Sequence, residues 1–133
     1  MNSEFRSPMK NARRLGSAKH GVRHFMTQRI TAVALVVLGI WFVWIALSLL
    51  HADYVGARAM VAQPFNAVLM LAFVVAAFWH AQLGLQVVIE DYVHTRALEL
   101  ALQVAVKFLC FLGAAASALA VIRIALGPAP LGS

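Results

Sequence analysis

FNAVLMLAFVVAAFWHAQLGLQVVIEDY, which runs from Phe65 to Tyr92, is the stretch of sequence that decides the fold. Between Phe65 and Ile89 it contains no Asp, Glu, Lys or Arg, and about 20 such residues suffice for a helix to cross a bilayer. The composition agrees, because 62% of the 133 residues are hydrophobic and only 12% are charged. Soluble domains are about 45–50% apolar and about 25% charged. The sequence therefore predicts an integral membrane protein.

His80 is the one ionisable side chain well inside this span. Hydrocarbon offers an imidazole no water, so a histidine at this depth indicates a functional site. On an i, i+3, i+4 count, Ala76 and Gly84 share its helical face, which leaves a groove suited to a flat, bulky group. Asp91 falls nearly on the same face, about 16 Å further along the helix axis, and Tyr92 follows it.

Two further apolar segments predict two more spans. ITAVALVVLGIWFVWIALSLL, residues 30–50, contains no charged residue, and a third apolar segment covers about 102–126. We therefore expect an all-α membrane protein with spans at about 30–50, 65–89 and 102–126, inside a membrane domain of residues 29–127. The link of residues 90–99 is short, so the second and third spans should be antiparallel neighbours. The run GAAASA at residues 113–118 predicts a close helix–helix contact, because small residues let helices approach.

The basic residues indicate the topology. Seven of the eleven Lys and Arg lie in the first 29 residues, whereas the connection between the first two spans contains one. By the positive-inside rule, the tail of residues 1–28 and the link of residues 90–99 are cytoplasmic. We expect no nucleic-acid partner, because the charge sits in this tail and not on a folded surface. A mitochondrial transit peptide shares the Arg-rich composition, but Glu4 counts against it. Residues 128–133 form a short C-terminal tail.

Two roles are open for His80. It could make an interhelical hydrogen bond, with Gln82 or Gln86 helping, and need no cofactor. It could instead bind a metal or haem. A zinc site needs three or four ligands, and the chain has no second one at this depth. Haem needs only one axial histidine from each side, so a bis-histidine iron would take its second ligand from another chain.

These residues resemble a known family. The pattern His80-x3-Gly84-x6-Asp91-Tyr92, preceded by GVRHFMTQRITA at residues 21–32, resembles the small hydrophobic membrane anchor of bacterial succinate dehydrogenase. The resemblance extends from about Gly16 to Gly127 and includes the PFNAV start of the second span. It implies three transmembrane helices that form part of a haem-binding bundle with a partner anchor subunit in the bacterial inner membrane.

The resemblance also implies a function and residue roles. The chain would anchor a succinate:quinone oxidoreductase (respiratory complex II), in which a flavoprotein subunit oxidises succinate and an iron–sulfur subunit passes on the electrons. His80 matches the axial ligand of haem b, with the second ligand supplied by the second membrane anchor, and Gly84 lies in the haem groove. Tyr92 matches the phenol that hydrogen-bonds ubiquinone, with Asp91 beside it. Arg29 matches an arginine near the haem propionates and the quinone pocket.

Some positions depart from the family pattern. Certain relatives have a histidine and an aspartate where this chain has Arg23 and His24, so these two residues receive no role. Two other classes of protein are alternatives. One is a haem-free structural or assembly protein in which His80 only hydrogen-bonds. The other is a transporter fragment, which broken helices or repeated halves would indicate; the sequence shows neither.

Overall fold

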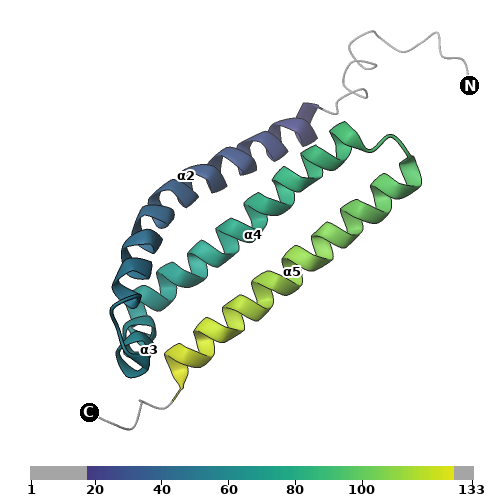
Figure 1. Ribbon diagram of the computed structural model, residues 1–133. Helices are drawn as coiled ribbons and strands as arrows, with labels where there is room; N and C mark the ends of the chain where they lie inside the picture. The colour runs from purple at the N-terminus through teal and green to yellow at the C-terminus, as the bar shows by residue number, and fades with distance from the viewer. Residues whose placement is uncertain (1–17, 128–133) are drawn as a thin grey trace, which may run out of the picture.

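A computed structural model describes residues 18–127, which form four α-helices (Figure 1). They are α2 (Ala18–Leu49), α3 (Tyr54–Ala62), α4 (Pro64–Tyr92) and α5 (Arg96–Leu126), and no strand occurs among these residues. Three of them, α2, α4 and α5, are long and apolar enough to cross a membrane. The prediction of an all-α membrane protein with three spans is confirmed. The predicted C-terminal tail and the first 17 residues of the predicted N-terminal tail lie outside the described residues.

The long helices extend beyond the predicted spans. α2 begins at Ala18, so residues 18–28, which were predicted to belong to the tail, are helical. This segment contains no proline and includes Ala, Lys, Arg, Met and Gln, which are good helix formers. Hydropathy marks only the part of a helix that lies in hydrocarbon, and the backbone hydrogen bonds continue past it.

The link between α4 and α5 is shorter than the predicted segment of residues 90–99. α4 continues to Tyr92 and α5 begins at Arg96, which leaves only residues 93–95 between them. Hydrogen bonds between side chains four residues apart support both extensions, from Gln86 to Glu90 at 2.8 Å and from Gln103 to Glu99 at 3.2 Å. The turn is therefore tight, and α4 and α5 are antiparallel neighbours, as predicted (Figure 1).

α3 lies in the connection between the first two spans, where no helix was predicted. The Asp53 carboxylate caps its start by accepting a hydrogen bond of 2.9 Å from the Gly56 N–H. α3 stops at Ala62 because Gln63 precedes a proline and takes an extended conformation (φ −58°, ψ 129°). Pro64 then occupies the first turn of α4, where its missing N–H costs no hydrogen bond.

α4 is the central helix, with α2 on one side and α5 on the other (Figure 1). Phe42 of α2 stacks on Phe73 of α4, with ring centroids 4.4 Å apart and planes inclined by 9°. On the other side, a Cβ added to Gly113 of α5 would lie 2.5 Å from the ring of Phe78. The predicted close approach of α5 to α4 therefore occurs at Gly113, the first residue of the small-residue run. Ala115 and Ala116 of the same run are exposed.

Few side chains are buried within this single chain. Large apolar side chains stand exposed on every long helix, for example Ile40 at 72% and Phe111 at 71%. Such a surface would be a severe aggregation hazard in water, but it is what lipid or neighbouring subunits cover. Among residues 21–127, the buried residues are Ile45, Asn66, Ala67, Leu83, Ile89 and Val121.

Candidate functional site

His80 faces α2. Its Nδ1 atom lies 3.1 Å from the Thr31 hydroxyl oxygen, which is a hydrogen bond between the first and second spans. Phe73, seven residues earlier on α4, also contacts α2, through the Phe42 ring. Because seven residues are almost two helical turns, both contacts belong to one face of α4. The inter-span contact lies away from the ends of the bundle, with His80 about 18 Å along the helix axis from Tyr92.

The hydrogen-bond partners of Thr31 favour one tautomer of the His80 imidazole. The Thr31 hydroxyl lies 2.9 Å from the Thr27 carbonyl and 3.0 Å from the Gln28 carbonyl, and its single hydrogen can point to either of these acceptors. The hydroxyl oxygen is then left to accept a hydrogen bond from His80. In this arrangement Nδ1 of His80 donates, and Nε2 carries the lone pair.

The Nε2 atom of His80 is accessible from outside the chain. Within residues 18–127 it has no hydrogen-bond partner, yet it is not among the polar atoms that are enclosed without one. His80 as a whole is half-buried. With the proton on Nδ1, the Nε2 lone pair is therefore presented at the surface of the protein, at a level of the span where the surroundings are apolar.

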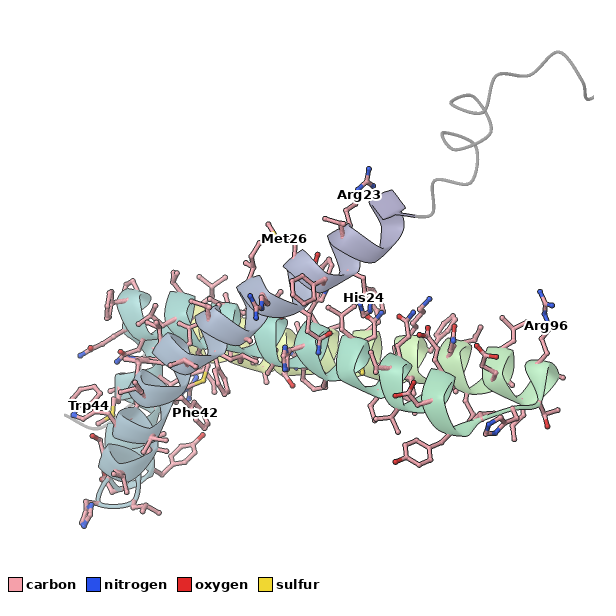
Figure 2. The ribbon with its side chains drawn as sticks, turned by 90° about the horizontal axis from the view of Figure 1, so that it is seen from above. Arg23, His24, Met26, Phe42, Trp44 and Arg96 are labelled. Atoms are coloured by element: carbon pink, nitrogen blue, oxygen red, sulfur yellow. The ribbon has the colours of Figure 1, made fainter. Side chains whose placement is uncertain are left out.

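Open space adjoins Gly84, one turn further along α4. A Cβ added there would meet no atom within 4 Å, in contrast to Gly113. Seen from above, α2 crosses α4 obliquely, and its N-terminal part near Arg23 stands away from the C-terminal part of α4 (Figure 2).

α2 carries a polar stripe made of His24, Gln28 and Thr31, which was not predicted as a unit. Their spacing of four and three residues puts them on one helical face, and His24 lies on the side of α2 toward α4 (Figure 2). His24 Nε2 and Gln28 Oε1 are enclosed without a hydrogen-bond partner among the described residues. Leaving an enclosed polar atom without a hydrogen bond costs about 1–3 kcal/mol of stability, so each of these two atoms calls for a polar partner.

Arg29 is exposed, and its guanidinium carbon lies 4.9 Å from the centroid of the Phe25 ring. α2 and α4 are antiparallel, and Thr31 is opposite His80, so Arg29 lies nearly level with His80. From its place before the first apolar run, Arg29 was expected near Asp91 and Tyr92 at the cytoplasmic edge. The structure does not bring them together, because the alignment of Thr31 with His80 leaves Arg29 about 15 Å along the helix axis from Tyr92.

Asp91 and Tyr92 form the C-terminal end of α4. Both are exposed, Tyr92 at 78%, and the chain turns away directly after them because Val93 is extended (φ −102°, ψ 110°). The phenol thus projects from the rim of the bundle. The site residues form two groups, one around His80 and one at this rim.

The candidate metal ligands inside the membrane span would suit a metal-containing group that supplies most of its own ligand atoms. In the described part of the chain, no three His, Cys, Asp or Glu side chains come together as a metal-binding cluster. His80 offers a single nitrogen at its level. A porphyrin needs one axial nitrogen from each side and supplies the other four itself.

Comparisons with known proteins give a consistent result. A family model described as "Succinate dehydrogenase/Fumarate reductase transmembrane subunit" matches residues 3–114. The succinate dehydrogenase hydrophobic membrane anchor subunit of Rickettsia bellii (strain RML369-C) is 36% identical over 71 residues, which are 53% of this chain and 57% of the relative. The protein of the same name from Rickettsia conorii (strain ATCC VR-613 / Malish 7) is 32% identical over 69 residues, 51% of this chain and 55% of the relative. The matches thus span little more than half the length of these relatives. No solved structure matches the chain.

Proposed function

The chain belongs to the succinate dehydrogenase/fumarate reductase transmembrane subunit family, and we propose that it anchors a succinate:quinone oxidoreductase in the membrane. In this proposal it binds haem b through His80 and contributes Tyr92 to the quinone-reduction site. An anchor of this family implies other subunits and a lipid bilayer. The proposal names those subunits as a flavoprotein that oxidises succinate, an iron–sulfur protein and a second anchor. The isolated chain would not oxidise succinate.

The observation that carries the haem assignment is the hydrogen bond from His80 to Thr31. Histidines that bind a metal typically donate their other N–H to a fixed acceptor, which sets the tautomer and the orientation of the ring. Thr31 would do this for His80, and the lone pair of Nε2 would remain for the iron. When bound, haem b supplies one-electron redox chemistry. The second histidine would come from the partner anchor, because His51 and His94 lie near the ends of the bundle and His24 lies about two helical turns along α2 from Thr31, the residue opposite His80.

The polar stripe on α2 and Arg29 would hold the propionates. A guanidinium fork pairs with a carboxylate bidentately, and Arg29 lies nearly level with His80 along the helix axis, on a different side of α2 from the polar stripe. His24 can donate from Nε2, and Gln28 can turn its amide nitrogen toward an oxygen. The two enclosed atoms of the stripe that have no partner among the described residues would then be satisfied.

Tyr92 would act on the quinone. Its exposed phenol can donate a hydrogen bond to a quinone carbonyl, an interaction that strengthens as negative charge builds on that oxygen during reduction. Asp91, beside it, offers a carboxylate at the same rim. Reduction of a quinone to a quinol takes up two protons, and an end that faces the cytoplasm can receive them from water. The predicted orientation therefore fits this role.

Optical spectroscopy tests the proposal. Membranes that contain the chain and its co-purifying subunits should give a b-type reduced-minus-oxidised difference spectrum. His80→Ala should abolish or strongly weaken it. His51→Ala is the matched control, because His51 lies in the turn after α2, where its Nδ1 atom is 3.1 Å from the Leu47 carbonyl oxygen. A full signal in His80→Ala membranes would rule out His80 as the ligand.

A haem-free structural role is the second candidate, and the same hydrogen bond favours it. The contact of His80 with Thr31 joins two spans and would by itself explain a histidine in the membrane. His80→Gln separates the candidates, because an amide can replace the hydrogen bond but is not expected to ligate haem. A structural role predicts normal assembly of the His80→Gln protein and no b-type spectrum in the wild type. The haem proposal predicts a spectrum that His80→Gln removes.

A further inference from the structure

A cavity of about 460 Å³ lies at the end of the bundle opposite Tyr92. It is formed where the C-terminal end of α2, the short helix α3 and the C-terminal end of α5 meet (Figure 1). Four aliphatic side chains and Tyr54 form much of its wall, and the two remaining lining residues are Arg58 and Arg123. No part of the proposed haem and quinone sites lies at this end.

The two arginines converge although they come from different helices. Arg123 lies in the last turn of α5. Arg58 of α3 reaches the same place, because its Nη2 atom is 2.8 Å from the position that a Cβ on Gly127 would occupy, directly after α5. Two guanidinium groups in one partly apolar cavity repel each other, and an anion bound between them would offset this repulsion by attracting both.

Neither arginine has an acidic partner among residues 18–127. No Asp or Glu lines the cavity. Asp53, the acidic residue of this end, is occupied in capping α3 through the Gly56 N–H at 2.9 Å. The site is therefore positively charged and offers up to ten N–H donors that the described residues do not use.

Snorkelling is the simplest alternative. A lone arginine in the last turn of a membrane helix lies favourably near the carbonyl end of the helix dipole and can extend to the headgroups. This would account for Arg123. Snorkelling does not explain why Arg58, which comes from a separate short helix, lines the same cavity. The family match ends at residue 114, so Arg123 lies beyond it.

We propose that this cavity binds the phosphate group of an anionic phospholipid, with Arg58 and Arg123 as its ligands. The phosphate of a lipid and free inorganic phosphate share the chemistry that guanidinium groups recognise. The lipid is the source we assign, because the cavity lies at the end of two apolar spans and its aliphatic wall can contact an acyl chain. Free phosphate would leave that wall exposed to water.

Lipid retention by the purified protein is the test. The full chain, with the subunits that co-purify, is exchanged into a neutral detergent and given phosphatidylglycerol, phosphatidylcholine or inorganic phosphate. Native mass spectrometry then measures how much lipid stays bound. We expect phosphatidylglycerol to bind more tightly than phosphatidylcholine, and millimolar inorganic phosphate not to displace it.

Substitutions locate the lipid. Each of Arg58→Gln and Arg123→Gln should weaken phosphatidylglycerol binding about five-fold, and the double variant about 25-fold, the change that about 1 kcal/mol per basic residue produces near an anionic surface. Arg96→Gln is the matched control, since it removes the same charge from an exposed position at the start of α5, the other end of the bundle. It should bind as the wild type does.

Three results would overturn the proposal: wild-type lipid binding in the double variant, equal retention of the two lipids, or displacement of the lipid by inorganic phosphate. Thermal unfolding in lipid-free detergent checks that each variant is folded. If the double variant does not accumulate, the five-fold losses of the single variants decide the question. The haem spectrum plays no part in any of these outcomes.

Discussion

Thr31→Val removes the hydroxyl that positions His80 and keeps the side-chain volume nearly constant. The Thr31 oxygen lies 3.1 Å from Nδ1 of His80, and with the proton on Nδ1 it accepts this hydrogen bond. Donation through this bond makes the imidazole a more basic ligand, which favours ferric over ferrous iron. Its loss should therefore raise the midpoint potential of the haem.

The size of the shift follows from the strength of the bond. A hydrogen bond of this kind contributes about 0.5–1.5 kcal/mol net. If all of it acted on one oxidation state, the one-electron potential would rise by about 20–65 mV, so this range is an upper bound. Redox titration of the b-type absorbance in purified membranes resolves such a change.

Thr27→Val is the matched control for this substitution. The Thr27 hydroxyl also bonds a carbonyl four residues earlier on α2, at 2.9 Å, but it makes no contact with His80. Thr27→Val should keep the wild-type potential, and Thr31→Ser, which retains a hydroxyl, should stay close to it. The reasoning is refuted if Thr31→Val leaves both the midpoint potential and the haem content unchanged.

The other predictions concern the quinone site, the packing and the topology. Tyr92→Phe should lower quinone reductase activity several-fold or more through loss of one hydrogen bond. The haem spectrum and succinate oxidation with an artificial acceptor should stay normal; full quinone activity would make the phenol a mere interfacial anchor. Gly113→Ala places a methyl 2.5 Å from an α4 ring and should destabilise the protein by about 1–3 kcal/mol in thermal or denaturant unfolding. The methyl group added by Gly39→Ala meets no atom within 4 Å, so this variant should not be destabilised. Equal stability of the Gly113→Ala and Gly39→Ala proteins would contradict the close α4–α5 contact. Reporter fusions at Ala57 and Thr95 should report the outside and the cytoplasm respectively, and the reverse result would misplace the quinone site.

The spans could be predicted from the sequence because hydropathy is a local property. The charge-free run from Phe65 to Ile89 places α4 without any knowledge of its neighbours. The helix ends could not be placed in the same way, because Ala18 and Arg96 lie outside the apolar runs. α3 was missed because nine residues give a weak pattern, although Asp53 before it and Pro64 after it are ordinary start and stop signals.

The candidate site was only partly predictable for a related reason. His80 is recognisable by its depth in the span. Its contact with Thr31 depends on how α2 is aligned against α4, which tertiary packing such as the Phe42–Phe73 stack determines. The same alignment moves Arg29 away from Tyr92 and to the level of His80. The spacing of His24, Gln28 and Thr31 was a usable signal for the polar stripe.

The central claim is that Nε2 of His80 ligates haem iron, and ligand rescue tests it most directly. His80→Gly removes the imidazole and leaves a space of about its size. The account predicts that the b-type spectrum is lost in His80→Gly membranes and returns when free imidazole is added. A normal spectrum in His80→Gly membranes without imidazole would contradict the claim.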